Sequence, residues 1–230
     1  MKNRILPLIT IGIFILPSIG FSSVNLPGWY VSAKGGIFQG SFDQKYLDQT
    51  DIIKQNIETN TQQNGYTGGI AVGYQKSYCQ TYLLGGELSA NLDTHHSTFQ
   101  SGASTAAFSD LIDIKSHVDL TFVPGILLTE SISAYLKLGV SYASLTDNLS
   151  SPVGSTATMT GFSANKNILG AAAGIGIAKM MTPHISIFAE GNYHDYGMVD
   201  LPAFQNFTAN YTHSTHVISS SIEVGAAYHF

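Results

Sequence analysis

The chain ends in the run His216-Val-Ile-Ser-Ser-Ser-Ile-Glu-Val-Gly-Ala-Ala-Tyr-His-Phe230, in which side-chain polarity alternates. From Ile218 onward every second residue is mostly apolar, and the residues between them are small or polar. Alternation with a period of two predicts a strand with one apolar and one polar face. In a soluble sheet the apolar face would turn inward, whereas in a membrane barrel it faces lipid and the polar face lines the lumen. The rest of the chain favours the membrane barrel.

The composition supports a sheet that faces lipid. The chain has 230 residues, which is enough for one domain of modest size. Only 11% of the residues are charged, whereas about 25% is typical of soluble domains. Glycine is abundant at 23 residues, with 12 tyrosines and 12 phenylalanines. The alternative is a soluble β-sandwich, but such a domain usually carries more surface charge.

Residues 1–22 have the features of a cleaved secretory signal peptide. Lys2 and Arg4 give a basic start, and an apolar segment follows. The small residues Gly20 and Ser22 suit a cleavage site. A retained anchor is the alternative, but the apolar segment is shorter than the roughly 20 residues that a spanning helix needs. We therefore expect an exported chain, residues 23–230, that has no helical span.

The exported chain is acidic. It holds eight lysines, no arginine and fifteen acids, which gives a formal charge of −7 (8 − 15). This balance argues against a basic surface that binds nucleic acid. The single cysteine, Cys79, cannot form an internal disulfide, and we expect it to be a passive turn or wall residue.

Segments with period-two alternation recur along the exported chain and predict eight strands. They are Trp29–Ser41, Tyr66–Lys76, Tyr78–Asn91, Lys115–Thr129, Ser131–Leu145, Lys166–Met180, His184–Met198 and Thr215–Phe230. Short turns near Ser77, Glu130 and residues 181–184 alternate with four long connections, residues 42–65, 92–114, 146–165 and 199–214. Short turns at one end and long loops at the other are typical of outer-membrane barrels. The predicted fold is all-β, an eight-stranded antiparallel up-and-down transmembrane β-barrel.

The alternation also divides the side chains between the two faces of the wall. The fifth strand, for example, places Leu136, Leu138 and Val140 on the lipid side, and the sixth lines the lumen with small residues. Six charged residues fall on inward positions, and we expect them to form a charge network inside the barrel: Lys34, Glu87, Asp119, Lys137, Glu190 and Glu223. Two readings stay open, an ion path and a polar plug that keeps the barrel closed.

Several strands resemble the small outer-membrane barrels of the OmpA transmembrane-domain, OmpX and opacity-protein type. The first contains Gly28-Trp-Tyr-Val-Ser-Ala-Lys-Gly-Gly36, and the last ends in Gly225-Ala-Ala-Tyr-His-Phe230. The seventh contains Tyr193-His-Asp-Tyr-Gly197, and the matches keep the family's order. The resemblance implies a monomer in the Gram-negative outer membrane, surrounded by lipid and lipopolysaccharide, with mobile external loops. It also implies an assembly signal at Tyr228 and Phe230 that the barrel-assembly machinery reads.

The four long connections are expected outside the cell, where they would meet any partner. They carry nine acids and two lysines, a formal charge of −7 (2 − 9), so polyanions are poor partners. Their aromatic residues could anchor a protein partner or pack on the barrel rim: Phe99, Phe108, Phe204, Phe207 and Tyr211. We therefore expect a noncatalytic barrel for envelope structure and surface interaction, such as adhesion or contact with host-cell or serum proteins.

Two other functions stay open. A narrow pore is one, although barrels with aqueous channels use about 16–18 strands and eight leave little lumen. A lipid A-modifying enzyme is the other, and it needs a nucleophile, a histidine base and an orienting acid. His184, Ser186 and Glu190 have the right types, but they follow a short turn on the expected periplasmic side.

We expect no cofactor and no metal site. The adjacent residues His95 and His96, with Asp93 nearby, are the strongest candidate ligands in the sequence. Neighbouring side chains point to opposite faces of an extended chain, however, so this pair is weak support for a metal.

Overall fold

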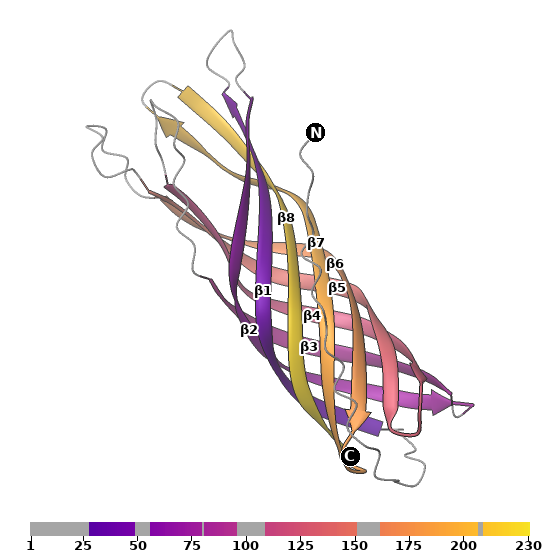
Figure 1. Ribbon diagram of the computed structural model, residues 1–230. Coiled ribbons are helices and arrows are strands. Elements are labelled where there is room, and N and C mark those ends of the chain that lie inside the picture. Colours follow the sequence, from indigo (N-terminus) through magenta and orange to yellow (C-terminus); the bar gives the residue numbers. More distant parts are fainter. Residues whose placement is uncertain (1–27, 49–55, 80, 96–108, 151–161, 207–208) are drawn as a thin grey trace, which may run out of the picture.

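The computed structural model describes residues 28–48, 56–79, 81–95, 109–150, 162–206 and 209–230. Its strands are β1 (Gly28–Asp48), β2 (Asn56–Tyr78), β3 (Tyr82–His95), β4 (Ser109–Leu127), β5 (Ile132–Ser150), β6 (Phe162–Met180), β7 (Ile185–Asn206) and β8 (Ala209–His229). Each strand pairs antiparallel with the next, and β8 pairs with β1 from Tyr30↔His229 onward, which closes the barrel (Figure 1). The predicted fold class and strand number are confirmed. Within these residues, no helix is long and apolar enough to cross a membrane.

The outer face of the barrel is apolar, as the alternation predicts. Leu136, Leu138 and Val140 expose 47%, 52% and 48% of their surface. Near the end where the short turns lie, which we call the turn end, the rings of Trp29 and Tyr74 meet edge to face, with centroids 5.4 Å apart. Soluble monomers rarely expose so continuous an apolar surface, whereas a lipid-facing barrel wall requires one.

The strands extend well beyond the predicted limits, and the predicted loop bounds are wrong. The connections at the opposite end, which we call the loop end, comprise residues 49–55, 96–108, 151–161 and 207–208, all outside the described residues, as are residues 1–22. The predicted loop 199–214 is mostly a hairpin, with β7 and β8 paired as far as Asn206↔Ala209. Apolar alternation in the sequence reveals only the part of a strand that faces lipid. The backbone hydrogen-bond ladder continues where both faces of the strand are polar, so the strands are longer than the pattern predicts.

At the turn end the structure shifts one predicted connection. Strand β2 continues to Tyr78, so the turn to β3 lies around Cys79, beyond Ser77. Cys79 is exposed and has a positive φ of 51°, a conformation that tight turns use. Its predicted place as a turn residue is confirmed.

The barrel wall opens along two seams toward the loop end. Pairing of β3 with β4 ends at Leu92↔Ser116, and pairing of β6 with β7 ends at Ala171↔Asp195. Backbone pairing continues beyond the seams in two separate groups of strands. Pairing within β4–β5–β6 extends to Ser109↔Ser150, and pairing within β7–β8–β1–β2 extends to Asn206↔Ala209. We call these two groups the three-stranded lip and the four-stranded lip; Figure 1 shows the strands fanning apart at this end.

A β-bulge lies beside each seam. On β4 the register shifts between Ile114 and Ser116, and on β7 it shifts between Asp195 and Gly197. Gly197 has a φ of 67°, which glycine adopts without steric cost. Bulges bend a strand and increase its twist, which accounts for the divergence of the two lips at this level.

Candidate functional site

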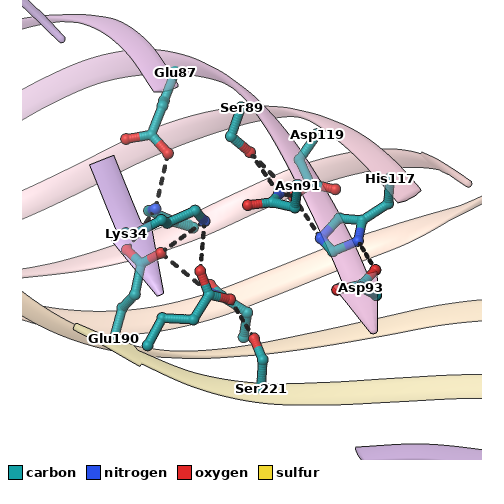
Figure 2. A network of polar contacts seen from close by, with 12 residues as sticks. Lys34, Glu87, Ser89, Asn91, Asp93, His117, Asp119, Glu190 and Ser221 are labelled. Atoms are coloured by element: carbon teal, nitrogen blue, oxygen red, sulfur yellow. Dashed lines mark hydrogen bonds and ion pairs between the residues drawn. The ribbon is translucent and has the colours of Figure 1, made fainter. Parts of the chain in front are cut away.

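A network of buried ion pairs crosses the lumen and contains five of the six predicted charged residues. Lys137 Nζ lies 2.8 Å from Glu87 Oε1 and 2.5 Å from Glu190 Oε2. Lys34 Nζ lies 3.0 Å from both Glu190 Oε1 and Glu223 Oε2. Glu190 therefore joins the lysines of β1 and β5, which lie on opposite sides of the closed barrel. Figure 2 shows its contact with Lys34. We call these five residues the Glu–Lys network.

Three carboxylates face two ammonium groups in this network, and neutral donors supply the remaining hydrogen bonds. The Tyr30 hydroxyl donates to Glu87 Oε2 at 2.7 Å, and the Tyr135 hydroxyl donates to Glu190 Oε2 at 3.2 Å. Asn192 Nδ2 donates to Glu190 and Glu223 at 3.2 and 3.1 Å. A buried charge is tolerated when it is paired and hydrogen-bonded, so these donors offset the excess of one carboxylate in the network.

Glycines on neighbouring strands make room for the two tyrosines. A Cβ atom on Gly73 would lie 2.3 Å from the Tyr30 ring, and one on Gly176 would lie 2.3 Å from the Tyr135 ring. Tyr30 and Tyr135 can therefore reach the network only because Gly73 and Gly176 have no side chain.

The sixth predicted residue, Asp119, belongs to a separate group with histidines that the sequence interpretation missed. His117 on β4 and His194 on β7 face each other with ring centroids 4.9 Å apart. Asp119 Oδ2 lies 3.6 Å from His117 Nε2, and Asp119 Oδ1 lies 3.4 Å from His194 Nε2. Asp93 Oδ2 bonds His117 Nδ1 at 2.8 Å (Figure 2). We call His117, His194, Asp119 and Asp93 the histidine cluster. All four occupy inward-facing positions in the period-two pattern of their strands, and that pattern is the sequence signal that could have found them.

The lumen above these polar layers is filled with apolar side chains, whereas the sequence predicts only small and charged residues there. The cluster joins both lips and consists of Phe38, Phe42, Ile114, Ala143, Leu145, Ile168, Tyr196, Val199 and Val217. Between the Glu–Lys network and the histidine cluster, the gap that remains measures only about 10 Å³. That is about the space that the centre of one water molecule needs. At this level the described side chains therefore leave little space in the lumen.

Comparison with known proteins identifies the family. An uncharacterised protein of Coxiella burnetii is 31% identical over 195 residues, which cover 79% of this chain and 74% of that protein. The chain belongs to the family of this Coxiella protein. No protein-family model matches it.

Among solved structures, the outer membrane protein OprG shows that this chain has the fold of a small outer-membrane barrel. The outer membrane protein OprG of Pseudomonas aeruginosa is 17% identical, with a TM-score of 0.51 over 90% of this chain and 98% of OprG. The outer membrane protease OmpT of Escherichia coli is 12% identical, with a TM-score of 0.49 over 93% of this chain and 99% of OmpT. Together with the apolar outer face, the fold gives this Coxiella-family protein the architecture of an outer-membrane β-barrel.

The candidate catalytic residues of this family member are not brought together. Ser186 Oγ pairs with His229 Nε2 at 2.9 Å, while His184 is exposed and stacks on Tyr228. Glu190 is held by both lysines of the Glu–Lys network. Across the described chain, no carboxylate hydrogen-bonds to His229, so the Ser186–His229 pair lacks an orienting acid.

The remaining candidates take other places. Asp93 bonds His117 inside the barrel, and the side chains of His95 and His96 lie outside the described residues. Tyr228 and Phe230 face outward at the turn end, with ring centroids 5.3 Å apart. Their role as an assembly signal stays a prediction.

Proposed function

We propose that this protein is a noncatalytic outer-membrane barrel whose loop end faces outside the cell, where it contacts other proteins. Both ends of the described chain, Gly28 and Phe230, lie with the short turns, an arrangement typical of outer-membrane barrels with periplasmic termini. The observation that carries the proposal is the pair of lips, because they continue beyond the level at which the wall stops being a closed barrel.

The filled lumen supports a structural and binding role over transport. A solute that crossed the barrel would have to separate the buried ion pairs and then displace the apolar cluster. Both layers stabilise the wall in a single closed form. The gap of only about 10 Å³ between the Glu–Lys network and the histidine cluster argues against the alternative of a narrow pore.

The lips supply the features that a protein partner needs. The four-stranded lip continues in β1–β2 as far as Leu47↔Asn56 and in β7–β8 as far as Asn206↔Ala209. Along the seams, β2 before Gly65 and β7 after Asp195 have no paired neighbour on one side among the described residues. Unpaired strand edges offer backbone donors and acceptors to another chain. The acidic balance of the predicted loops favours a neutral or basic protein surface.

The test compares cells that display the intact protein with cells that display a barrel lacking the outer part of its four-stranded lip. The truncation replaces residues 45–58 and residues 200–214 by Asn-Gly turns, because Gln44↔Thr59 and Val199↔Thr215 are directly opposed pairs. Phe42 and Val199 of the apolar cluster are kept, so the closed part of the barrel should still fold.

We expect the intact protein to mediate binding to host cells or serum proteins and the truncated barrel to lose it. Equal surface levels and equal heat-modifiable migration on gels serve as the folding control. Equal binding by the two barrels would remove the proposal for the partners tested. Conductance of the intact barrel in planar bilayers would favour the pore instead.

A further inference from the structure

The histidine cluster has the geometry of a metal site. We propose that His117, Asp119 and His194 bind one transition-metal dication of the zinc type inside the barrel. Their ligand atoms, one from each side chain, all lie within 4.8 Å of one another. Imidazole nitrogens and a carboxylate oxygen are the donors that zinc, nickel, copper and iron accept from proteins.

The distances are near those of a tetrahedral centre. Two ligand atoms that lie about 2.05 Å from a zinc ion at the tetrahedral angle are about 3.3 Å apart. Asp119 Oδ1 lies 3.4 Å from His194 Nε2, and the other carboxylate oxygen, Oδ2, lies 3.6 Å from His117 Nε2. A rotation of the carboxylate that brings one oxygen toward both imidazoles would complete a set of three ligands, and a water molecule could supply a fourth.

The outer nitrogen of each imidazole is already held. His117 Nδ1 bonds Asp93 Oδ2 at 2.8 Å, and His194 Nδ1 bonds Ser219 Oγ at 3.3 Å. Both rings therefore present Nε2 to Asp119. A carboxylate behind a ligating histidine fixes its tautomer and strengthens it as a ligand, and this arrangement is usual in metal sites.

Charge and hydrogen bonding leave a place for a cation. Asp93 and Asp119 bring two buried negative charges, while both lysines of the Glu–Lys network already pair with three glutamates. The Asp119 side chain is only 9% exposed, and its Oδ1 makes no hydrogen bond within the described structure. Ser89 and Asn91 donate to the other oxygen, at 3.1 and 3.4 Å, which orients the carboxylate. A dication would offset both buried charges.

The site lies where the two lips separate. In the sequence, His117 is the residue after Ser116, where β3–β4 pairing ends at Leu92↔Ser116. His194 is the residue before Asp195, where β6–β7 pairing ends at Ala171↔Asp195. A bound ion would join β4 of the three-stranded lip to β7 of the four-stranded lip.

The test titrates Co²⁺ into the untagged full chain, folded in detergent micelles and first stripped with a chelator. We expect visible d–d bands that saturate at one Co²⁺ per barrel and disappear when Zn²⁺ is added. In His194→Asn and Asp119→Asn barrels the apparent Kd should rise at least about tenfold, since even a lost supporting residue costs 10- to 100-fold.

The matched control is His216→Asn. His216 pairs with Asp195 at 3.0 Å and is partly exposed, but it lies outside the cluster, so Co²⁺ binding should not change. The absence of saturable binding, or equal binding by His194→Asn and the unaltered protein, would overturn the proposal.

A measurement on the unaltered protein covers the case in which the variants fail to fold. The imidazole ¹⁵N resonances of its eight histidines report zinc directly. We expect Zn²⁺ to shift the Nε2 resonances of two histidines and to leave the others unchanged. A spectrum in which no histidine shifts at one equivalent would also overturn the proposal.

Discussion

Replacement of Lys137 by methionine should be among the most destabilising single changes in the lumen. Lys137 Nζ lies 2.8 Å from Glu87 and 2.5 Å from Glu190, and all three side chains are buried. Methionine keeps most of the side-chain volume but leaves three glutamates against the single charge of Lys34. Removing one partner of a buried ion pair typically costs about 3–5 kcal/mol, and we expect the free energy of unfolding to fall by about that amount.

The fluorescence of Trp29, the single tryptophan, can follow urea unfolding in micelles. Its side chain is 60% exposed on the outer face, so it leaves the apolar phase when the barrel opens. The matched control is Lys115→Met, an exposed lysine whose loss should change stability by no more than about 0.5 kcal/mol. The double variant Lys137→Met/Glu87→Gln should recover part of the loss, because two glutamates and Lys34 again give a net charge of −1. A loss below about 1 kcal/mol for Lys137→Met would refute the assignment of this network as a dry ionic plug.

Three further outcomes test other layers of the lumen. Gly73→Val should cost about 1–3 kcal/mol by unfolding, since its Cβ would meet the Tyr30 ring at 2.3 Å, whereas Gly86→Ala, with 3.8 Å to the nearest atom, should be nearly neutral. Phe42→Ala, at a fully buried position, should cost about 3–5 kcal/mol in the same assay, and a neutral result would mean that the apolar cluster does not seal the loop end. Zn²⁺ at a hundred times its Kd should raise the free energy of unfolding by about 2.7 kcal/mol, an increase that chelator reverses and His194→Asn abolishes.

The sequence predicts the wall of this barrel well because the pleat fixes which way each side chain points. Once Leu136 and Leu138 face lipid, Lys137 must face the lumen, and the structure places it there. The number of strands follows from the same alternation, which the short turns interrupt at one end and the polar connections at the other. The length of each strand cannot be predicted from the alternation, because backbone pairing continues beyond the residues that show the apolar pattern.

The contacts across the lumen could not be predicted in the same way. Which lysine meets which glutamate depends on the stagger of strands around the barrel, and period-two alternation carries no information about stagger. Glu190 reaches Lys34 across a sequence separation of 156 residues. His117 and His194 each stand alone in their strands, so only the closed barrel shows that they face the same carboxylate.

The order of the Glu–Lys network and the histidine cluster along the barrel axis favours ion binding over ion conduction. From the turn end, a pocket of about 50 Å³ bordered by Tyr30, Tyr135 and His229 stops at the Glu–Lys network, whose buried pairs cost several kcal/mol to separate. From the loop end, both seams begin at the level of the histidine cluster, which lies on that side of the Glu–Lys network. A cation that entered from the loop end would therefore have to leave on the same side of the membrane. That is the behaviour of a binding site, and it is compatible with a lumen that the Glu–Lys network seals.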